Sequence, residues 1–311
     1  MTTVTTAPGR ITARAQRVHG MRRVKNSLAT VLITGSFGVA LIPLIWLLWT
    51  VIGRGWHVIV TSEWWTGDQR GITFRDPGGG ALHAIIGTAE EVAICAMISI
   101  PLGLLVAIYL VEYGGGRFAR ITTFMVDILT GIPSIVAALF VYAIFFIEFG
   151  AQFAGVYAAL ALVLLMVPVI VRTTEEMLKL VPDELREASY ALGVPKWKTI
   201  LRIVLPTALS GITTGIVLGI ARVAGETAPL LVLVQYSPNT NNNVFSGFQG
   251  SLPLMIKSEV KNLGSNYSFT GQKIHNYAPD RMWGAALTLI IIVMALNLIA
   301  RLLGRFSKIS R

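Results

Sequence analysis

Two charged side chains interrupt a long apolar stretch of the sequence. The segment ARVAGETAPLL covers residues 221–231 and places Arg222 and Glu226 four positions apart. In a continuous helix this spacing puts both side chains on one face, one turn apart. A guanidinium donates paired hydrogen bonds to an oxyanion, and a carboxylate beside it accepts a hydrogen bond from a protonated oxyanion but repels one without a proton. These residue types at this spacing therefore fit an anion site.

Two structural interpretations of the same residues stay open. In the first, Arg222 and Glu226 form a buried ion pair that only fixes the register of packed helices. In the second, Glu226 is unpaired and stays protonated. A charged side chain at the centre of a membrane costs at least about 2.5 to 3.5 kcal/mol. If the stretch crosses a membrane, Arg222 is therefore expected to face protein or water and to have a partner.

The composition indicates that the stretch does lie in a membrane. Apolar residues make up 54% of the chain and charged residues 14%, whereas charged residues form about a quarter of ordinary soluble domains. The mean hydropathy is +0.66. Several apolar runs reach the roughly 20 residues that cross a bilayer core of about 30 Å. Because only helices satisfy their own backbone groups segment by segment in lipid, we predict an all-α integral membrane protein.

We expect six transmembrane helices. The first apolar run is about twice as long as the core of a signal peptide and follows a long polar tail, so we expect it to remain as an anchor. Pro133, in the third run, is expected to kink its helix and to free a backbone carbonyl. The predicted spans are residues 27–52, 81–111, 121–147, 153–171, 207–234 and 282–303.

The positions of Lys and Arg predict the orientation. An even number of spans places both termini on one side, and the tails and loops on that side, together with Arg301 at the end of the last span, hold 18 of these residues against seven in the opposite loops. Basic residues gather in cytoplasmic segments, so we predict that both termini are cytoplasmic. The net charge of +10 then reflects attraction to membrane lipid rather than to nucleic acid, because the basic residues lack the interleaved aromatic side chains of a base-stacking surface.

The longest cytoplasmic loop, residues 172–206, has the features of two ordered helices. Pro182 is expected to open the first helix and Gly193 to close it with a left-handed residue, while Pro195 begins the second. Ala188 and Leu192 share one face of the first helix. That face suits a groove on a cytosolic partner, or alternatively the base of the bundle itself.

This loop resembles the EAA-x3-G-x9-I-x-LP loop of the ABC importer permeases. The matching residues are Glu187, Ala188, Ser189, Gly193, Ile203, Leu205 and Pro206, with only Ser189 in place of the usual second alanine. The resemblance implies a type I importer permease fold. It also implies that the loop is a coupling helix that fits a cleft in the ATPase subunit, through Glu187, Ala188, Ser189, Leu192 and Gly193.

The chain lacks the G-x4-G-K-[ST] signature of a phosphate-binding nucleotide loop. We therefore expect that it is not an enzyme and binds no cofactor of its own, and that a separate partner subunit binds and hydrolyses ATP. The only cysteine, Cys95, is expected to be a buried apolar residue, and no cluster of residues has the spacing of a metal site.

Further motifs narrow the resemblance to the membrane subunits of the phosphate-specific importers, the PstA-type permeases in particular. They are Leu102-Gly103-x5-Tyr109-Leu110-x-Glu112-Tyr113, Gly131-Ile132-Pro133-Ser134-Ile135-Val136 and Arg222-x-x-Gly225-Glu226-Thr227-Ala228-Pro229. The similarity extends from about residue 80 to the C-terminus. It implies inward transport of inorganic phosphate by alternating access in a prokaryotic cell membrane, with a PstC-type sister permease, two PstB-type ATPases and an external PstS-type phosphate-binding protein.

The candidate pathway and packing residues lie around these motifs. Asp127 lies one turn before Gly131, and both a pathway role and a packing role are possible for it. A basic group is expected opposite it. Ser134 is expected either to line the route or to bond a freed backbone carbonyl. Glu90 and Glu91 are expected in a solvated outer third of the second span. The pathway candidates are Arg222, Glu226, Thr227, Ser134 and Asp127. On the helical wheel, the face of Arg222 and Glu226 also carries the glycines expected to permit close helix contact, Gly211, Gly215 and Gly219.

The expected organisation is simple, and some functional alternatives remain. The outer loop 235–281, rich in Asn, Ser and Gly, is either the surface that receives the binding protein or disordered. The other candidates for function are a permease for molybdate, sulfate or phosphonate, a stand-alone anion channel and a scaffold without transport. The parts are a basic cytoplasmic tail (1–26), the first helix and an external loop (27–80), a permease core (81–303) and a second cytoplasmic tail (304–311).

Overall fold

Long apolar runs dictate the architecture, because each must satisfy its backbone hydrogen bonds internally. The computed structural model describes residues 20–264 and 275–309, and in this part the secondary structure is helical apart from one isolated bridge between Tyr236 and Gln249. The chain forms two units, residues 1–50 and 51–311. Three predicted segments fall partly outside the described residues: the N-terminal tail (1–19), the outer loop (265–274) and the C-terminal tail (310–311).

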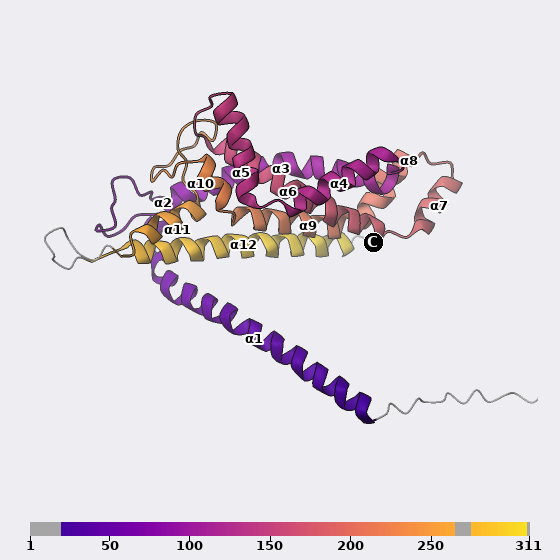
Figure 1. The fold of residues 1–311 in the computed structure, drawn as a ribbon, viewed down its shortest axis with the longest axis horizontal. Coiled ribbons are helices and arrows are strands. Elements are labelled where there is room, and N and C mark those ends of the chain that lie inside the picture. The colour runs from indigo at the N-terminus through magenta and orange to yellow at the C-terminus, as the bar shows by residue number, and fades with distance from the viewer. Residues whose placement is uncertain (1–19, 265–274, 310–311) are drawn as a thin grey trace, which may run out of the picture. The chain divides into compact units, whose positions relative to one another are not determined.

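The helix α1 (Gly20–Ile59) forms the described part of the first unit and continues into the second. Three π-helical turns extend or precede other helices: η1 (Tyr109–Tyr113), η2 (Ala143–Glu148) and η3 (Ile200–Val204). The remaining helices are α2 (Ser62–Thr66), α3 (Leu82–Ile108), α4 (Arg117–Gly131), α5 (Ser134–Tyr142), α6 (Gly155–Lys179), α7 (Asp183–Ala191), α8 (Lys196–Thr199), α9 (Leu205–Ala224), α10 (Ala228–Leu233), α11 (Leu252–Lys261) and α12 (Ala278–Ile309) (Figure 1).

The predicted membrane helices are present in the structure, but the third is sharply bent. Five helices among the described residues are long and apolar enough to cross a membrane, and a sixth span results if the pair formed by α4 and α5 with η2 is counted as one. This pair is bent by 105°. The bend falls where Pro133, whose backbone is extended, precedes α5. Proline has no N–H to continue the ladder of α4, so the predicted kink is confirmed.

The prediction of one continuous helix over residues 207–234 is wrong. α9 ends at Ala224 and α10 begins at Ala228, so Glu226 lies between two helices and not one turn after Arg222 on the same helix. The physical reason is Pro229, which stands in the first turn of α10. In a continuous helix its ring would clash with the carbonyl of Gly225. At the first turn of a new helix the missing N–H has no cost.

The core of the second unit lies between α3 and α6, and α9 packs on α6 with α12 beside it (Figure 1). The apolar face of α6 supplies Leu162, Met166 and Ile170, each almost completely buried, and Cys95 of α3 joins them. Gly103 permits this approach, since a Cβ atom there would lie 2.6 Å from a methyl carbon of Ile170. The expected role of Cys95 as a buried apolar residue is confirmed.

A cap closes one end of this bundle; it consists of α2, residues 67–81, residues 235–251, α11 and the first turn of α12. At its centre the Arg281 guanidinium donates to the Glu259 carboxylate, with Nε and Oε1 2.9 Å apart, and both side chains are about 5% exposed. Gln69 donates to the same oxygen over 2.9 Å. Arg281 also donates to three backbone carbonyls of residues 73–78. One buried arginine therefore holds segments from three parts of the chain.

Two further contacts fasten the loops of the cap. The hydroxyl of Tyr236 donates to Gln69 over 2.7 Å, and burial raises the pKa of that hydroxyl, so it remains a donor. Partial burial raises the pKa of Asp68, but hydrogen bonds from the backbone N–H groups of Arg70 and Thr240 outweigh this effect and hold the pKa below its usual value. The hydrogen bond from Thr240 joins residues 235–251 of the cap to residues 67–81.

The cap corrects two expectations about polar residues. Disorder does not describe residues 235–264, since Leu252 and Met255 there are fully buried. The expectation that Glu90 and Glu91 are both solvated is wrong for Glu91, which is 2% exposed. Glu90 accepts a hydrogen bond from Gln249 of the cap. Glu90 is half-buried beside this contact, so only Glu91 is removed from solvent.

We predict that Arg281→Met destabilises the protein by about 3 to 5 kcal/mol, because it leaves the Glu259 carboxylate buried without its cation. Thermal unfolding of the purified protein in detergent would measure the change. The control is the double variant Arg281→Met with Glu259→Met, which removes both charges and should recover much of the loss. Equal stability of the single variant and the wild type would contradict the role of the pair.

Candidate functional site

The break between α9 and α10 presents the charged residues that the sequence singles out. Arg222 lies in the last turn of α9 and is exposed, Glu226 is half-buried in the break, and Thr227 precedes the first residue of α10. Among the ion pairs of the described residues, none joins Arg222 to Glu226. The alternative of an ion pair between them that fixes the register of packed helices is therefore not what this arrangement offers, and the Arg222 guanidinium is exposed.

A second break, between α4 and α5, places Ser134 at the first position of α5. The two helices that follow the breaks, α5 and α10, pack against each other through a shared apolar cluster. Ala138 and Val141 come from α5, and Leu230 and Leu233 from α10. Ser134 and Thr227 thus each lie at the start of one of two packed helices.

Asp127 of α4 does oppose a basic group, and that group is Arg172 of α6. The other arm of the guanidinium donates to Glu175 over 2.7 Å, and Lys179 donates to the second oxygen of Glu175 over 2.6 Å. Four charges therefore form one chain across α4 and α6. The sequence prediction missed Arg172 because it ended the fourth span at residue 171, although the apolar face of α6 continues through Leu178, which is fully buried.

The three glycines of α9 face α6. A Cβ atom at Gly211 would meet the flexible side chain of Met177, whereas one at Gly215 would lie 2.5 Å from Oγ1 of Thr173. A Cβ atom at Gly219 would lie 3.6 Å from the end of the Met166 side chain, an ordinary contact distance. The close approach of α9 and α6 therefore depends on Gly215 more than on Gly219.

The predicted loop helices are present at the opposite end of the bundle from the cap. α7 begins after Pro182, α8 begins after Pro195, and Gly193 has the predicted left-handed backbone, with φ +77°. Glu187 and Ala188 are exposed, and Leu192 is 83% exposed.

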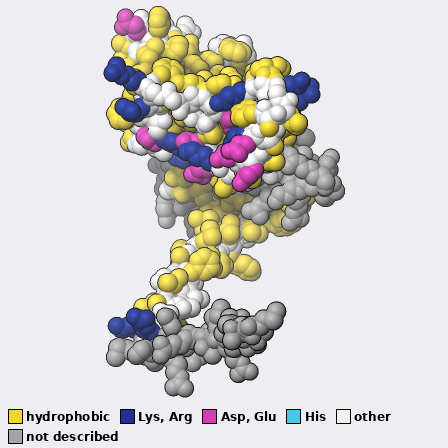
Figure 2. Space-filling model, turned by 90° about the vertical axis from the view of Figure 1, so that its right-hand side faces the viewer, with side chains coloured by type: hydrophobic (Ala, Val, Ile, Leu, Met, Phe, Trp, Pro, Cys, Tyr) yellow, Lys and Arg dark blue, Asp and Glu magenta, His cyan; other side chains and the backbone are white. Residues whose placement is uncertain are grey.

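Ser189 differs from these outward residues. It is buried, and its hydroxyl lies 2.8 Å from that of Thr199 in α8. Figure 2 shows the end that carries α7, where Lys, Arg, Asp and Glu side chains gather on an otherwise apolar surface. The outward side of α7 thus combines charged residues with exposed apolar side chains, namely Leu185, Tyr190 and, just after the helix, Leu192.

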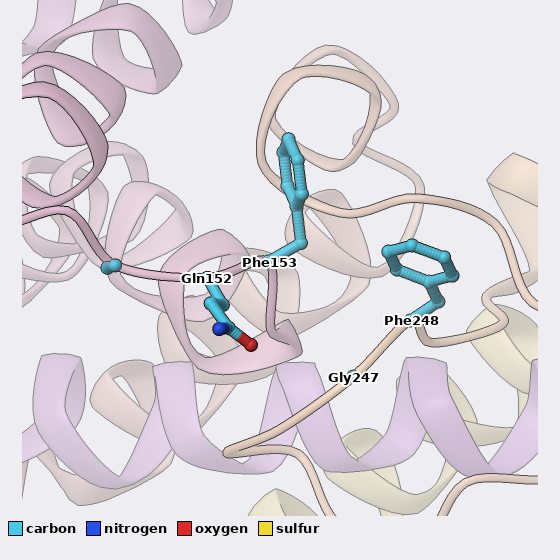
Figure 3. A pocket seen from close by; sticks show the side chains of 5 residues that line it. Gln152, Phe153, Gly247 and Phe248 are labelled. Carbon is cyan, nitrogen blue, oxygen red and sulfur yellow. The ribbon is translucent and has the colours of Figure 1, made fainter.

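A cavity of about 520 Å³ lies near the cap, between the connection from η2 to α6 and the loop 235–251 (Figure 3). Its lining includes the side chains of Gln152, Phe153 and Phe248 together with Gly247. It has no charged side chain in its lining, so it does not resemble an anion site. Nothing in the sequence pattern indicated it.

Comparison with known proteins places this geometry in a family. Residues 99–308 match the family described as "Binding-protein-dependent transport system inner membrane component". Over 91% of its length the chain is 56% identical to "Phosphate transport system permease protein PstA 1" of Mycobacterium tuberculosis (strain CDC 1551 / Oshkosh), of which it covers 89%. The chain belongs to the PstA family of permeases. The resemblance inferred from its motifs is thereby confirmed.

More distant relatives agree with this assignment. The PstA protein of Yersinia pestis is 38% identical over 91% of the chain and 90% of that protein. A crystal structure of a bacterial alginate ABC transporter, in complex with a pentasaccharide-bound periplasmic protein, is 15% identical with a TM-score of 0.59, over 93% of this chain and 97% of that chain. This last likeness establishes the fold. The chain is a multi-pass inner-membrane permease of the ABC importer type, a class that works with ATPase and substrate-binding partners.

We predict that Gly215→Ala destabilises the PstA permease by about 1 to 3 kcal/mol, because the new methyl group overlaps a β-branched side chain in a tight contact. The matched control is Gly219→Ala, which has room for the methyl group and should be neutral or slightly stabilising. Thermal unfolding in detergent compares the two variants. A larger loss for Gly219→Ala would contradict the packing of α9 on α6.

Proposed function

We propose that this permease is the membrane subunit of an ATP-driven importer that moves inorganic phosphate into the cytoplasm by alternating access. The observation that carries the proposal is the 56% identity to a phosphate transport permease over 91% of the chain. The exposed guanidinium at the break between α9 and α10 supplies a chemical reason, since arginine recognises phosphate by planar paired hydrogen bonds. Permeation of another oxyanion is less favoured, because the relatives compared are named for phosphate.

The pathway in this proposal runs along Arg222, Glu226, Thr227, Ser134 and Asp127. An exposed arginine within the bilayer requires water or protein beside it, and a route shared with a second permease provides both. Glu226 accepts a hydrogen bond from protonated phosphate and disfavours sulfate. Asp127 would repel an anion by itself, but its pairing with Arg172 offsets that charge.

The proposed partners suit surfaces that the single chain leaves exposed. Large apolar side chains of α4 and α5 are exposed, among them Phe124 and Phe140, and they suit a PstC-type sister permease or lipid. The outward side of α7, with Glu187 and Leu192, suits one of two PstB-type ATPases, which would bind the ATP because this chain would hold no cofactor. The cap suits an external PstS-type phosphate-binding protein. Nucleic acid is not a partner in this proposal.

The orientation places α7 in the cytoplasm and the cap outside the cell. It rests on the excess of Lys and Arg in the tails and in the loop 172–206. Both termini are then cytoplasmic, with a basic tail at residues 1–26 and a short one at 304–311. Residues 27–80 anchor the chain and contribute to the cap, and residues 81–303 form the permease core.

We predict opposite labelling of two single cysteines in a Cys95→Ala background. A cysteine in place of Asn242, which is exposed in the cap, should react with a membrane-impermeant thiol reagent in intact cells. A cysteine in place of Lys198, which is half-exposed in α8, should react only after the membrane is permeabilised. The reverse pattern would overturn the orientation.

We predict that Arg222→Lys lowers phosphate uptake about tenfold, because an ammonium keeps the charge but loses the paired hydrogen bonds. Glu226→Gln should weaken the preference for phosphate over sulfate more than it weakens assembly. Uptake of labelled phosphate, with sulfate as competitor, would be measured in liposomes that contain the complete importer. Arg70→Lys, an exposed position in the cap, is the control. Uptake near the wild-type rate in Arg222→Lys would exclude this residue from the pathway.

A further inference from the structure

A buried ion pair joins the coupling-loop helix α7 to the end of α3. Arg186 of α7 donates to one carboxylate oxygen of Glu112 through Nη2 over 2.9 Å and through Nε over 3.1 Å. The two side chains are only 12% and 5% exposed. Glu112 lies in η1, which continues α3 with helical backbone angles at the junction. The pair therefore connects a helix near the surface to one of the two central helices.

The same guanidinium also holds the end of α6. Its Nη2 donates to the carbonyl of Leu178 over 3.0 Å, and its Nη1 donates to the carbonyl of Val181 over 2.7 Å. Leu178 lies in the last turn of α6 and Val181 just after it, a region where carbonyl groups run out of partners within the helix. Arg186 therefore fixes α3, α6 and α7 to one another at a single point.

A second contact supports the first. Lys196, the first residue of α8, donates its Nζ to the backbone carbonyl of Glu112, and its ammonium lies 4.9 Å from the ring centre of Tyr113. The buried pair of Ser189 and Thr199 joins α7 to α8. Because of these contacts α7, α8 and η1 cannot move far relative to one another unless buried hydrogen bonds break.

We propose that Glu112 and Arg186 are a positioning pair that transmits displacement of α7 to α3 during the transport cycle. The inference rests on the proposed function, in which α7 docks on the ATPase. Separation of the pair would leave a carboxylate buried without its cation, which is strongly unfavourable. The charge-assisted hydrogen bonds of Arg186 fix its orientation relative to Glu112 as well as the distance between the two side chains. When the ATPase displaces α7, η1 and α3 follow, and the α3–α6 core rearranges with them.

The surroundings offer a matched control. Asp183 also accepts a hydrogen bond from Arg186, over 3.0 Å, but its side chain is 87% exposed. An exposed pair of this kind contributes little. Loss of the Asp183 carboxylate therefore tests the same arginine without touching the buried contact.

The experiment uses the complete importer in liposomes, supplied with inorganic phosphate, its binding protein and ATP. Two rates are measured for each variant, ATP hydrolysis and phosphate uptake. For Glu112→Gln we expect that the ATPase subunits still co-purify and hydrolyse ATP, while the phosphate transported per ATP hydrolysed falls about tenfold, within the range typical of coupling between sites. Asp183→Asn should keep the wild-type ratio.

Two comparisons separate this proposal from the function on which it rests. Glu187→Arg, on the outer side of α7, should weaken ATPase binding itself. If Glu187→Arg impairs transport but assembled Glu112→Gln keeps the wild-type ratio, the positioning pair is wrong and the docking role stands. If Glu187→Arg binds the ATPase and transports normally, the docking role fails. Where Glu112→Gln does not assemble, Arg186→Lys decides, since it keeps the charge but cannot reach Glu112 and the carbonyls of Leu178 and Val181 together. A wild-type ratio there also overturns the proposal.

Discussion

A backbone N–H or C=O group without a partner costs several kcal/mol in hydrocarbon, and this cost governs where the chain can leave a helix. It does so twice within the bundle, and both breaks are closed by short-range bonds. At the first, the N–H of Ile132 donates to Leu129 and that of Val136 to Pro133. At the second, the N–H of Gly225 donates to Arg222 and that of Glu226 to Val223. The breaks thus place Ser134 and Thr227 at helix starts with little loss of backbone pairing.

The same cost orders the charges. Arg281 with Glu259, Arg186 with Glu112 and Arg172 with Asp127 all pair inside the chain, and each pair joins two different helices. Arg222 has no ion-pair partner among the described residues, although it occupies the last turn of a membrane helix. In the proposed function this open charge faces an anion route beside a second permease, which would supply the water or protein that it requires.

Much of the fold followed from the sequence, because the strongest signals there are local. Apolar length gave the membrane helices, Pro133 gave the bend, and Pro182 and Gly193 gave the limits of α7. The prediction of a continuous fifth span was wrong because it rested on the spacing of Arg222 and Glu226 alone, although Pro229 indicates the start of a new helix. The cap could not be foreseen, since its contacts join residues far apart in sequence. For the same reason the sequence does not identify Arg172 as the partner of Asp127 or Arg186 as the partner of Glu112.

The cap also constrains the order in which the protein can be made. Arg281 bonds to the carbonyl of Thr73, 208 positions earlier, and to Glu259. Until the last helix leaves the ribosome, the Glu259 carboxylate lacks the Arg281 cation, and Gln69 is the remaining side-chain donor to its Oε1. An unfinished chain therefore leaves the Glu259 carboxylate and the carbonyls of residues 73–78 without this donor. The arginine that holds the loops of the cap is thus supplied only when the last helix is made.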